Sequence, residues 1–503
     1  MGVKPAPRPL RALLDALGDQ VVAQERLDGD GPIIHAIVDD SRKAGPGALF
    51  VAIAGTRDDG HTRAAAAVRE GAVAVVAERD IPNLAVPVVR VRDSRAALAS
   101  LAADWYAHPA RRLQAIGVTG TVGKTTVVAM LESILTRAGR QPGVVGSLGA
   151  GFGGAKRDTG MTTPGPLELH AALAGIAQQT DTVIMEVTSH ALVQARVLGL
   201  RFPLGIFTNL VMLEHLEYHA SFQDYVKAKT RFFDYVEPGG PLIYPAGDRL
   251  LAALVEGKGV RPVSCGAGVD VALHIERTAM TSQGTRLLFQ IEKPYPRVDG
   301  TRVQPMTFPA ALKLLGRAAI NNASLAAAAA LALGVEAETI AQALAELEPP
   351  RRRMEILRPG PVTLLDDTVG HPDSITGVFE VAEVVPHDRM YVVYAIRGRR
   401  GTEVNRRDAE AVAIWTRRSP VERIAVTAAS DATDDANRVT PEERDAFIEG
   451  LADAGAPYTY HERLEDAIEE ILPLGHPSDL VLLLGAQGMN RGAELALRRL
   501  GRA

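Results

Sequence analysis

A glycine-rich run holds the clearest candidate for chemistry in this sequence. Residues 117–126 read Gly-Val-Thr-Gly-Thr-Val-Gly-Lys-Thr-Thr, and they lie between an apolar run and an amphipathic stretch. Between a strand and a helix, backbone N–H groups and the helix N-terminus hold phosphates. The ammonium of Lys124 would reach the β- and γ-phosphates, and the hydroxyl of Thr125 would face Mg²⁺. We therefore predict an ATP-binding loop made of Thr119, Gly120, Thr121, Val122, Gly123, Lys124, Thr125 and Thr126.

This loop matches the general phosphate-loop pattern only in part. The pattern carries glycine five residues before Gly123, and this chain has Val118 there. The alternative is a glycine-rich turn that binds no nucleotide. The Gly-Lys-Thr at 123–125, between a strand and a helix, favours the interpretation as a nucleotide-binding loop.

The elements that must position the loop alternate between short apolar runs and helical stretches. A helix is expected over 94–106, and another over 125–138 that ends before Gly139. The apolar runs have the length and composition of buried parallel strands, and they cover 72–78, 113–120, 182–187, 362–367, 389–396 and 479–485. This alternation predicts an α/β fold with doubly wound sheets.

Two breaks divide a chain of 503 residues that is too long for one domain. One helix ends before His108-Pro109, and the helical block 321–348 ends at Pro349-Pro350, before three arginines. We predict domains over 1–110, 111–349 and 350–503, which are sizes typical of domains.

The composition excludes several classes of protein. A hydrophobic fraction of 47% and a charged fraction of 23% are typical of a globular chain. A net charge of −5 gives no sign of a dedicated nucleic-acid binder. Cys265 stands alone, so nothing requires an oxidising compartment, and no run of 18 uncharged apolar residues occurs. We expect a cytoplasmic protein with no nucleic-acid partner and no membrane span.

With these residues the sequence resembles the Mur ligase family, whose phosphate loop reads TGTNGK[ST]. Further motifs follow in the family's order over most of the chain, at 40–43 (DSRK), 59–61 (DGH), 186–192 (EVTSHAL), 207–210 (FTNL), 214–219 (EHLEYH) and 225–229 (YVKAK). They most resemble the members that add the third amino acid to UDP-N-acetylmuramoyl-L-alanyl-D-glutamate in peptidoglycan synthesis. The resemblance implies an N-terminal UDP-binding domain, a central P-loop ATPase domain and a C-terminal Rossmann-like domain that binds the amino acid.

Amide synthesis of this kind needs an activated carboxylate, because a carboxylate oxygen is a poor leaving group. Phosphorylation by ATP gives an acyl phosphate, which the amine attacks; this requires a γ-phosphate clamp and divalent cations. The resemblance implies that the catalytic residues are Lys124, Glu186, His215 and Lys229. It also implies a Mg²⁺ site formed by Thr125, Glu186, His215 and Lys229.

Two of these residues also carry a physical argument. Glu186 ends an apolar strand, where a carboxylate faces the ligand crevice of a parallel sheet; a capping or surface glutamate is the alternative. The family lysine that matches Lys229 is carbamylated, which turns a cation into an anion that helps to place Mg²⁺. We predict that Lys229 is carbamylated. The alternative is a lysine on the helix surface, for which Lys227 is the better candidate.

The resemblance assigns the substrate contacts residue by residue. The UDP-linked substrate is expected at Ser41, Thr56, Arg57, Thr162, Thr163, Thr188, Gln194 and Arg196. Further ATP contacts are expected at Asn322, Arg353 and Asp367. A guanidinium such as that of Arg196 suits a pyrophosphate or a carboxylate.

The C-terminal third departs from the family pattern. The incoming amino acid is expected at Arg438, the best match to the arginine of the family's DNPR motif, and at Asn490. The latter replaces the glutamate of the family's GKGHE motif and lacks the charge that would attract a distal ammonium. We therefore predict that meso-diaminopimelate is not bound in the usual way. In the phosphate loop, Val122 replaces the family's asparagine.

Added arginines distinguish the same third of the chain. They could receive an acidic or phosphate-bearing group, although a charge run is more often a solvated face; they are Arg397, Arg399, Arg400, Arg406 and Arg407.

The leading interpretation is an amide ligase that uses ATP and Mg²⁺ to join an amino acid to a UDP-N-acetylmuramoyl dipeptide, and we expect a monomer. One alternative is a Mur-type ligase outside peptidoglycan synthesis, closer to cyanophycin or folylpolyglutamate synthesis. The other is a non-catalytic paralogue that binds a nucleotide or a UDP-linked precursor.

Overall fold

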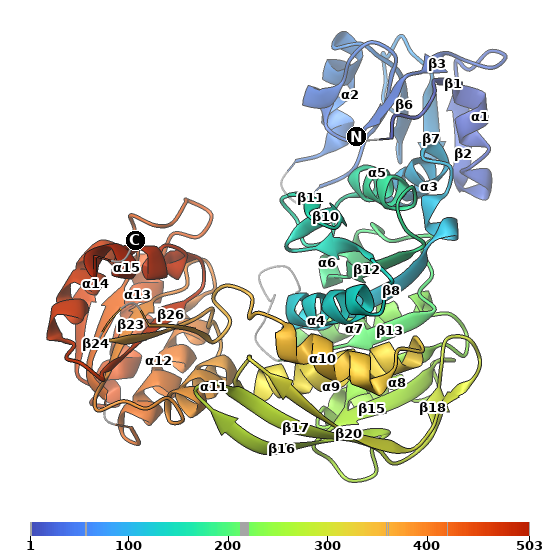
Figure 1. The fold of residues 1–503 in the computed structure, drawn as a ribbon. Helices are drawn as coiled ribbons and strands as arrows, with labels where there is room; N and C mark the ends of the chain where they lie inside the picture. Colours follow the sequence, from blue (N-terminus) through green and yellow to red (C-terminus); the bar gives the residue numbers. More distant parts are fainter. Residues whose placement is uncertain are drawn as a thin grey trace.

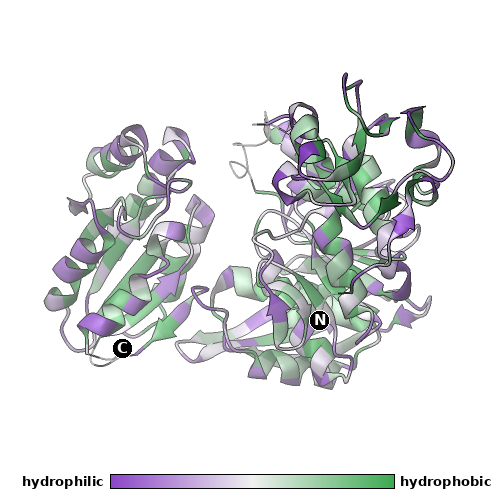
Figure 2. Ribbon diagram, turned by 90° about the horizontal axis from the view of Figure 1, so that it is seen from above, coloured by the Kyte–Doolittle hydropathy of each residue, from purple (hydrophilic) through white to green (hydrophobic). Residues whose placement is uncertain are grey.

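The chain folds around three large sheets, each built from its own segment (Figure 1). The computed structural model describes residues 3–55, 58–211, 221–358, 360, 362–419 and 421–501. Figure 2 shows strands mainly in hydrophobic colours and helices with hydrophilic residues on their outer sides. This is the α/β fold that the alternation of apolar runs predicts. In the described part of the chain, no helix is both long enough and apolar enough to cross a bilayer.

The N-terminal segment forms a five-stranded sheet in the order β2-β7-β6-β5-β4, in which only β2 runs antiparallel to its neighbour. Its strands are β2 (Val21–Glu25), β4 (Ala36–Val38), β5 (Ala48–Val51), β6 (Ala72–Ala77) and β7 (Val88–Val91), with β1 (Arg8–Pro9) paired to β3 (Ile33–Ile34) nearby. Its helices are α1 (Leu10–Leu14), α2 (Gly60–Arg69) and α3 (Ser94–Trp105). The buried ring of His61 contacts Asp59 at 2.7 Å and accepts a hydrogen bond from the Glu78 N–H at 3.0 Å, so the DGH motif fixes α2 against the end of β6.

The central segment forms an eleven-stranded sheet in the order β11-β10-β9-β12-β8-β13-β14-β15-β16-β17-β20. The strands from β9 to β16 in this order are parallel, and they are β9 (Gly143–Gly146), β12 (Thr182–Glu186), β8 (Gln114–Thr119), β13 (Leu204–Phe207), β14 (Pro241–Pro245), β15 (Arg261–Gly266) and β16 (Leu273–Thr281). Antiparallel strands extend both edges, namely β10 (Gly149–Phe152), β11 (Ala155–Arg157), β17 (Gly284–Ile291) and β20 (Met306–Leu312). A small hairpin pairs β18 (Tyr295–Pro296) with β19 (Arg302–Val303).

Helices cover this sheet and carry several site residues. They are α4 (Lys124–Arg137), α5 (Pro166–Ile176), α6 (Ser189–Val193), α7 (Phe222–Thr230), α8 (Arg249–Val255), α9 (Gly316–Ala332) and α10 (Ala337–Glu346). The alanine-rich helix α9 is buried over most of its length and packs against α4, because small side chains allow close approach. The helical block expected over 321–348 is split, since Gly334 has a φ of +81° and ends α9 before α10 begins.

The C-terminal segment forms a six-stranded sheet in the order β21-β22-β26-β23-β24-β25, parallel except for β21. Its strands are β21 (Glu355–Leu357), β22 (Thr363–Asp367), β23 (Met390–Ala395), β24 (Val421–Thr427), β25 (Tyr458–His461) and β26 (Leu480–Gly485). Its helices are α11 (Pro372–Ala382), α12 (Thr402–Thr416), α13 (Pro441–Asp453), α14 (Leu464–Ile471) and α15 (Gly492–Arg499). The last strand therefore lies in the middle of the sheet, between β22 and β23.

Two helix contacts join the three segments. Helix α5 packs against α3, and Leu167 of α5 packs on the N-terminal hydrophobic core. The start of α9 packs against α11, where Arg317 Nε donates to Glu380 Oε2 at 2.9 Å and Leu315 joins the C-terminal core. The central segment thus contacts the N-terminal segment through α5 and the C-terminal segment through α9.

Candidate functional site

The phosphate loop connects the end of β8 to the start of α4, as the sequence predicts. Gly120 has a φ of +131° and Gly123 a φ of +86°, a left-handed region that favours glycine. A Cβ on Gly120 would also collide with the hydroxyl of Thr208. The ammonium of Lys124 donates to the carbonyl oxygens of Gly120 and Thr121, each at 2.9 Å. The loop is therefore a compact backbone turn with one cation at its centre.

The segment after β13 holds this loop by its backbone. Asn209 Oδ1 accepts a hydrogen bond from the Val122 N–H at 3.0 Å, and Asn209 Nδ2 donates to the Val122 carbonyl at 3.1 Å. The Thr208 hydroxyl donates to the same carbonyl at 2.5 Å. The Val122 residue is itself 36% exposed. Val122 stands where the family has asparagine, and its hydrogen bonds to Thr208 and Asn209 are made by its backbone and not by its side chain.

Glu186 lies buried at the carboxyl end of β12, beside the phosphate loop, with 1% of its surface exposed. The Thr125 hydroxyl lies 3.1 Å from both carboxylate oxygens. The Ser147 N–H donates to Oε1 at 2.8 Å, and the Ser147 hydroxyl lies 3.4 Å from Oε2. Gly146 leaves the space for this approach, because a Cβ there would lie 2.5 Å from Oε1. The sequence predicts Thr125 and Glu186, whereas Ser147 was missed; the glycine-flanked turn after the Val144-Val145 strand was its only signal.

Lys229 lies on α7 and is buried behind the loop, with 1% of its surface exposed. Its ammonium donates to the Gly120 carbonyl at 2.6 Å and lies 3.4 Å from the Thr119 hydroxyl. Burial, and then the nearby Lys124, hold the pKa of Lys229 well below its usual value of 10.5, while Glu186 acts in the opposite direction. The surface lysine of this helix is Lys227, whose side chain is mostly exposed. Lys229 is thus a buried amine with a weakened affinity for protons.

The donor atoms at this point suit a hard cation. The Glu186 carboxylate and the Thr125 hydroxyl present oxygen, the ligand that Mg²⁺ prefers in proteins. Among the described residues, no group of three or more His, Cys, Asp or Glu side chains could hold a metal ion on its own. Glu186 and Thr125 could share a cation here with phosphate oxygens and water. Two further ligands are predicted: Lys229, which would have to be carbamylated, and His215, which lies outside the described residues.

Several residues predicted to bind the UDP-linked substrate adjoin Glu186. The Thr163 hydroxyl donates to the backbone carbonyl of Glu186 at 2.9 Å and lies 3.2 Å from the Thr188 hydroxyl. Arg196 Nη1 donates to the Thr163 carbonyl at 2.6 Å, and Arg196 Nη2 donates to Gln194 Oε1 at 2.7 Å. These side chains form one polar network that begins at the carboxylate.

Of the other residues predicted to bind the UDP-linked substrate, one joins this network and one lies in the N-terminal segment. The Thr162 hydroxyl lies 3.0 Å from that of Ser147, which joins it to the same network. Ser41 begins a short 3-10 helix in the N-terminal segment. Thr56 and Arg57 lie outside the described residues.

The predicted ATP contacts of the second half divide between two places. Asn322 of α9 is buried against the phosphate loop, since a Cβ on Gly123 would lie 2.6 Å from its Oδ1. Asp367 is buried at the end of β22 and accepts a hydrogen bond from the Met354 N–H at 2.7 Å. Burial raises the pKa of Asp367 to about 6. Arg353 is exposed on the linker that precedes β21.

The two residues predicted to bind the amino acid lie on different loops of the C-terminal sheet. Arg438 is exposed and pairs with Asp435 at 3.0 Å. Its backbone lies against Gly398 of the loop at residues 397–401, which we call the arginine-rich loop. A Cβ on Gly398 would approach the Arg438 carbonyl to 2.5 Å. Asn490 follows β26, and its Oδ1 accepts a hydrogen bond from Arg352 Nη1. No motif in the sequence points to a role for Arg352.

The arginine-rich loop is fixed by an internal carboxylate. The buried Glu443 accepts hydrogen bonds from the N–H groups of Arg399 at 3.0 Å, Arg400 at 2.7 Å and Gly401 at 2.7 Å. On α12, Arg406 pairs with Glu449 and Asp453, and Arg407 with Glu403, at the surface. These surface ion pairs are typical of a solvated face.

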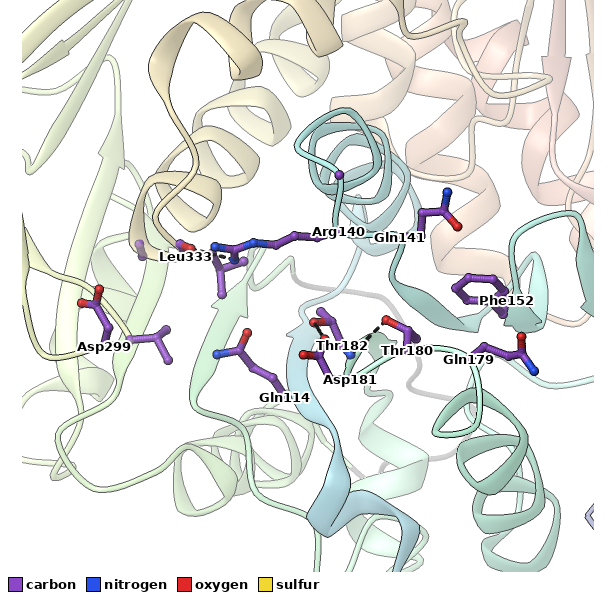
Figure 3. A pocket seen from close by; sticks show the side chains of 13 residues that line it. Gln114, Arg140, Gln141, Phe152, Gln179, Thr180, Asp181, Thr182, Asp299 and Leu333 are labelled. Carbon is purple, nitrogen blue, oxygen red and sulfur yellow. Dashed lines mark hydrogen bonds between the residues drawn. The ribbon is translucent and has the colours of Figure 1, made fainter.

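A cavity of about 810 Å³ lies at the end of the central sheet opposite to the phosphate loop (Figure 3). It opens at the amino ends of β8 and β12, beside Gln114 and Thr182, whereas Glu186 and the phosphate loop lie at the carboxyl ends. Figure 3 shows Arg140 extending towards Leu333, whose carbonyl it binds at 2.8 Å. None of the predicted site residues lines this cavity.

Comparison with known proteins places three family models along the chain. They are described as "Mur ligase family, catalytic domain" (residues 33–106), "Mur ligase middle domain" (118–330) and "Mur ligase, glutamate ligase domain" (352–487). The chain is 31% identical to UDP-N-acetylmuramoyl-L-alanyl-D-glutamate–2,6-diaminopimelate ligase of Halalkalibacterium halodurans, covering 94% of this chain and 93% of that protein. The corresponding ligase of Bacillus velezensis is 31% identical over 91% of this chain and 90% of its own. In fold, the chain is similar to MurF from Acinetobacter baumannii, with a TM-score of 0.67, 21% identity, and coverage of 99% of this chain and 100% of that one.

Proposed function

Because the chain belongs to the Mur ligase family, we propose that it joins an amino acid to UDP-N-acetylmuramoyl-L-alanyl-D-glutamate through an acyl phosphate. Members of this family are ATP-dependent amide ligases of peptidoglycan precursor synthesis, and so is this chain. The substrate is inferred from the relatives that match nearly the whole chain. Since ATP and a UDP-linked precursor are both required, we place the reaction in the cytoplasm.

One observation carries this proposal. The buried Glu186 carboxylate and the phosphate loop meet at the Thr125 hydroxyl, 3.1 Å from both carboxylate oxygens. A phosphate-binding turn joined to a fixed carboxylate is the arrangement that phosphoryl transfer needs, because the crowded phosphates require a counter-cation held in a set place. Mg²⁺ would supply that charge, held by Glu186 and Thr125 together with the predicted ligands His215 and carbamylated Lys229.

Each group of this site would have its own role in the reaction. The backbone N–H groups of the loop and the Lys124 ammonium bind and orient the phosphates of ATP. A carboxylate oxygen of the UDP-linked substrate attacks the γ-phosphorus, and ADP leaves. The amino group of the incoming amino acid attacks the acyl carbon and loses its proton, and phosphate leaves. The Thr163, Thr188 and Arg196 network would orient the carboxyl-bearing end of the substrate beside Glu186.

Lys229 is proposed to carry a carbamate. Carbamylation requires the neutral amine, and burial beside Lys124 lowers the pKa of Lys229, which favours that form. A carbamate on this side chain would add a negative group next to the phosphate loop, whose Gly120 carbonyl the ammonium contacts at 2.6 Å. The modification would relieve the repulsion between the buried Lys229 and the partly buried Lys124.

The incoming amino acid is proposed to differ from meso-diaminopimelate in how its side chain is bound. The amide oxygen of Asn490 already accepts a hydrogen bond from Arg352, and Asn490 has no charge to pair with a distal ammonium. Arg438 remains the proposed partner of the amino-acid carboxylate. We assign residues 1–110 to UDP binding, 111–349 to ATP and 350–503 to the amino acid, boundaries that stay predictions.

The test is a reconstitution with purified protein. ATP, Mg²⁺ and the UDP-muramoyl dipeptide are incubated with a panel of amino acids that includes meso-diaminopimelate, lysine, and neutral and acidic residues. Phosphate release and the mass of the product are followed, and Glu186→Gln serves as the matched inactive control.

Release of phosphate that depends on one amino acid, with a product heavier by that residue, supports the proposal. Binding of the UDP-linked substrate without turnover of any amine would instead favour a non-catalytic role. No binding of that substrate would favour a ligase that acts outside peptidoglycan synthesis. Fast turnover of meso-diaminopimelate alone would refute the proposal on the amino acid.

A further inference from the structure

The linker before β21, residues 351–354, contains two residues in an unusual backbone conformation. Arg352 has a φ of +57° and Met354 a φ of +52°, in the left-handed region that side chains with a Cβ disfavour. Only 11% of the Arg352 side chain is exposed, whereas its neighbours Arg351 and Arg353 are exposed. An arginine that is buried at a position suited to glycine needs contacts that offset the strain.

The Arg352 guanidinium makes those contacts with the C-terminal sheet. Its Nε donates to Asp366 Oδ1 at 3.2 Å, and Asp366 is fully buried on β22. Its Nη1 donates to the Ala486 carbonyl at 3.0 Å and to Asn490 Oδ1, and its Nη2 donates to the Gly485 carbonyl. One side chain therefore joins the linker to β22, to the end of β26 and to the loop that carries Asn490.

The other end of the linker reaches the phosphate loop through α9. The Met354 methyl group packs at the start of this helix, since a Cβ on Gly316 would lie 3.7 Å from it. Further along α9, Asn322 lies against Gly123 of the phosphate loop. The loop, α9, the linker and the Asn490 loop thus form one continuous series of packed contacts.

We propose that Arg352 is a positioning residue, which ties the linker to the carboxyl edge of the C-terminal sheet and thereby sets where the Asn490 loop lies relative to the phosphate loop. The inference rests on the proposed ligase function, in which the amine must meet the acyl phosphate. Small misplacements of reacting groups lower rates steeply, so losing the guanidinium should lower kcat/KM for the amino acid by roughly 10- to 100-fold.

The test removes the side chain without disturbing the backbone or stranding a charge. Glycine adopts a φ of +57° freely, and Asp366→Asn removes the carboxylate that would otherwise lose its partner. Arg352→Gly/Asp366→Asn is therefore compared with Asp366→Asn alone, and Arg351→Met is the control for losing an exposed arginine. Steady-state kinetics are measured separately for ATP, the UDP-linked substrate and the amino acid.

We expect the double variant to lose efficiency for the amino acid while KM for the UDP-linked substrate stays within about twofold of the Asp366→Asn background. The hydrogen bonds of the Arg352 guanidinium to described residues go to the C-terminal segment and not to the Glu186 network. Equal kinetics in the two variants would overturn the proposal. A parallel rise in KM for all three substrates would also overturn it, since that is the result of general loosening.

A second measurement does not depend on activity. Amide hydrogen exchange is followed in residues 351–354 and 485–490 of the same full-length variants. Joint loss of protection in both segments is expected when the guanidinium is removed, and loss confined to the linker would refute the coupling. If the wild-type protein ligates no amine, the proposed function fails, and the exchange experiment still decides whether Arg352 joins the two segments.

Discussion

The Lys229 ammonium lies 2.6 Å from the carbonyl oxygen of Gly120, so α7 supports the phosphate loop from behind through a buried amine. The Lys124 ammonium donates to the same carbonyl at 2.9 Å. Two cations therefore share one backbone oxygen in a site that also contains the Glu186 carboxylate. Such an arrangement favours loss of a proton from the more buried lysine.

Lys229 is predicted to be required as a lysine. Lys229→Ala and Lys229→Arg should each lower kcat by roughly 100-fold or more, because neither side chain can form a carbamate and a guanidinium keeps its proton. Lys227→Ala, on the exposed side of the same helix, should leave kcat within about twofold. Turnover and the mass of intact protein prepared with and without bicarbonate are the measurements. Full activity of Lys229→Arg would contradict the prediction.

Ser147 is predicted to orient Glu186. Ser147→Ala removes the hydroxyl 3.4 Å from Oε2 but keeps the N–H bond at 2.8 Å, so we expect a loss of about tenfold in kcat and a higher Mg²⁺ requirement. Glu186→Gln removes the charge itself and should cost roughly 100-fold or more. Mg²⁺ titrations of the initial rate check both changes. The control is Ser133→Ala on α4; a Mg²⁺ dependence of Ser147→Ala identical to that of the wild type would be against the assignment.

Asn209 is predicted to matter more for ATP than Val122 does. Asn209→Ala loses two hydrogen bonds to the Val122 backbone, which should loosen the loop and raise KM for ATP about tenfold. Val122→Asn changes only an exposed side chain, and KM should stay within about threefold. The comparison is made by ATP titration at saturating amounts of the other substrates. A larger effect from Val122→Asn would show that the side chain decides ATP affinity.

Asp367 is predicted to make stability depend on pH. Burial raises its pKa from 3.8 to about 6, so the folded protein binds this proton more tightly than the unfolded chain does. The stabilisation is complete below the unfolded value and is lost as the pH rises through about 6. Asp367→Asn can still accept the Met354 N–H bond but has no charge to bury. Its free energy of unfolding should therefore rise by about 2 kcal/mol relative to the wild type between about pH 4 and pH 7.

Urea unfolding of Asp367→Asn and of the wild type at these two pH values checks that difference. The exposed Asp373→Asn on α11 is the matched control and should show little change with pH. A constant difference between Asp367→Asn and the wild type across the range would argue that Asp367 keeps an ordinary proton affinity.

Periodicity predicts the parallel strands well and the antiparallel ones poorly. The apolar runs 72–78 and 182–187 correspond to β6 (Ala72–Ala77) and β12 (Thr182–Glu186), because strands buried on both faces are continuously hydrophobic. The hairpin β16–β17 was missed, since exposed and buried residues alternate along much of it and resemble a polar loop. The predicted doubly wound sheet is thus extended by strands that the apolar pattern does not mark.

The site shows a similar division. Lys124, Glu186 and Lys229 come from motifs, and the structure brings them together around Gly120 and Thr125. Ser147 and Arg352 could not be found in this way. The contact of Ser147 depends on its backbone N–H, and that of Arg352 depends on a left-handed φ, and neither can be predicted from the residue type. Chemistry carried by side chains is visible in a sequence, whereas chemistry carried by backbone geometry is not.

The central place of β26 has a consequence for how the protein is made. Leu480 pairs with Thr363 on one side and with Met390 on the other, so β22 and β23 stay without their shared neighbour until the ribosome has released residues 480–485. The first two sheets contain only earlier residues and can form beforehand. During synthesis, a nascent chain therefore exposes two open strand edges in its last third, and these edges are where aggregation or chaperone binding would begin.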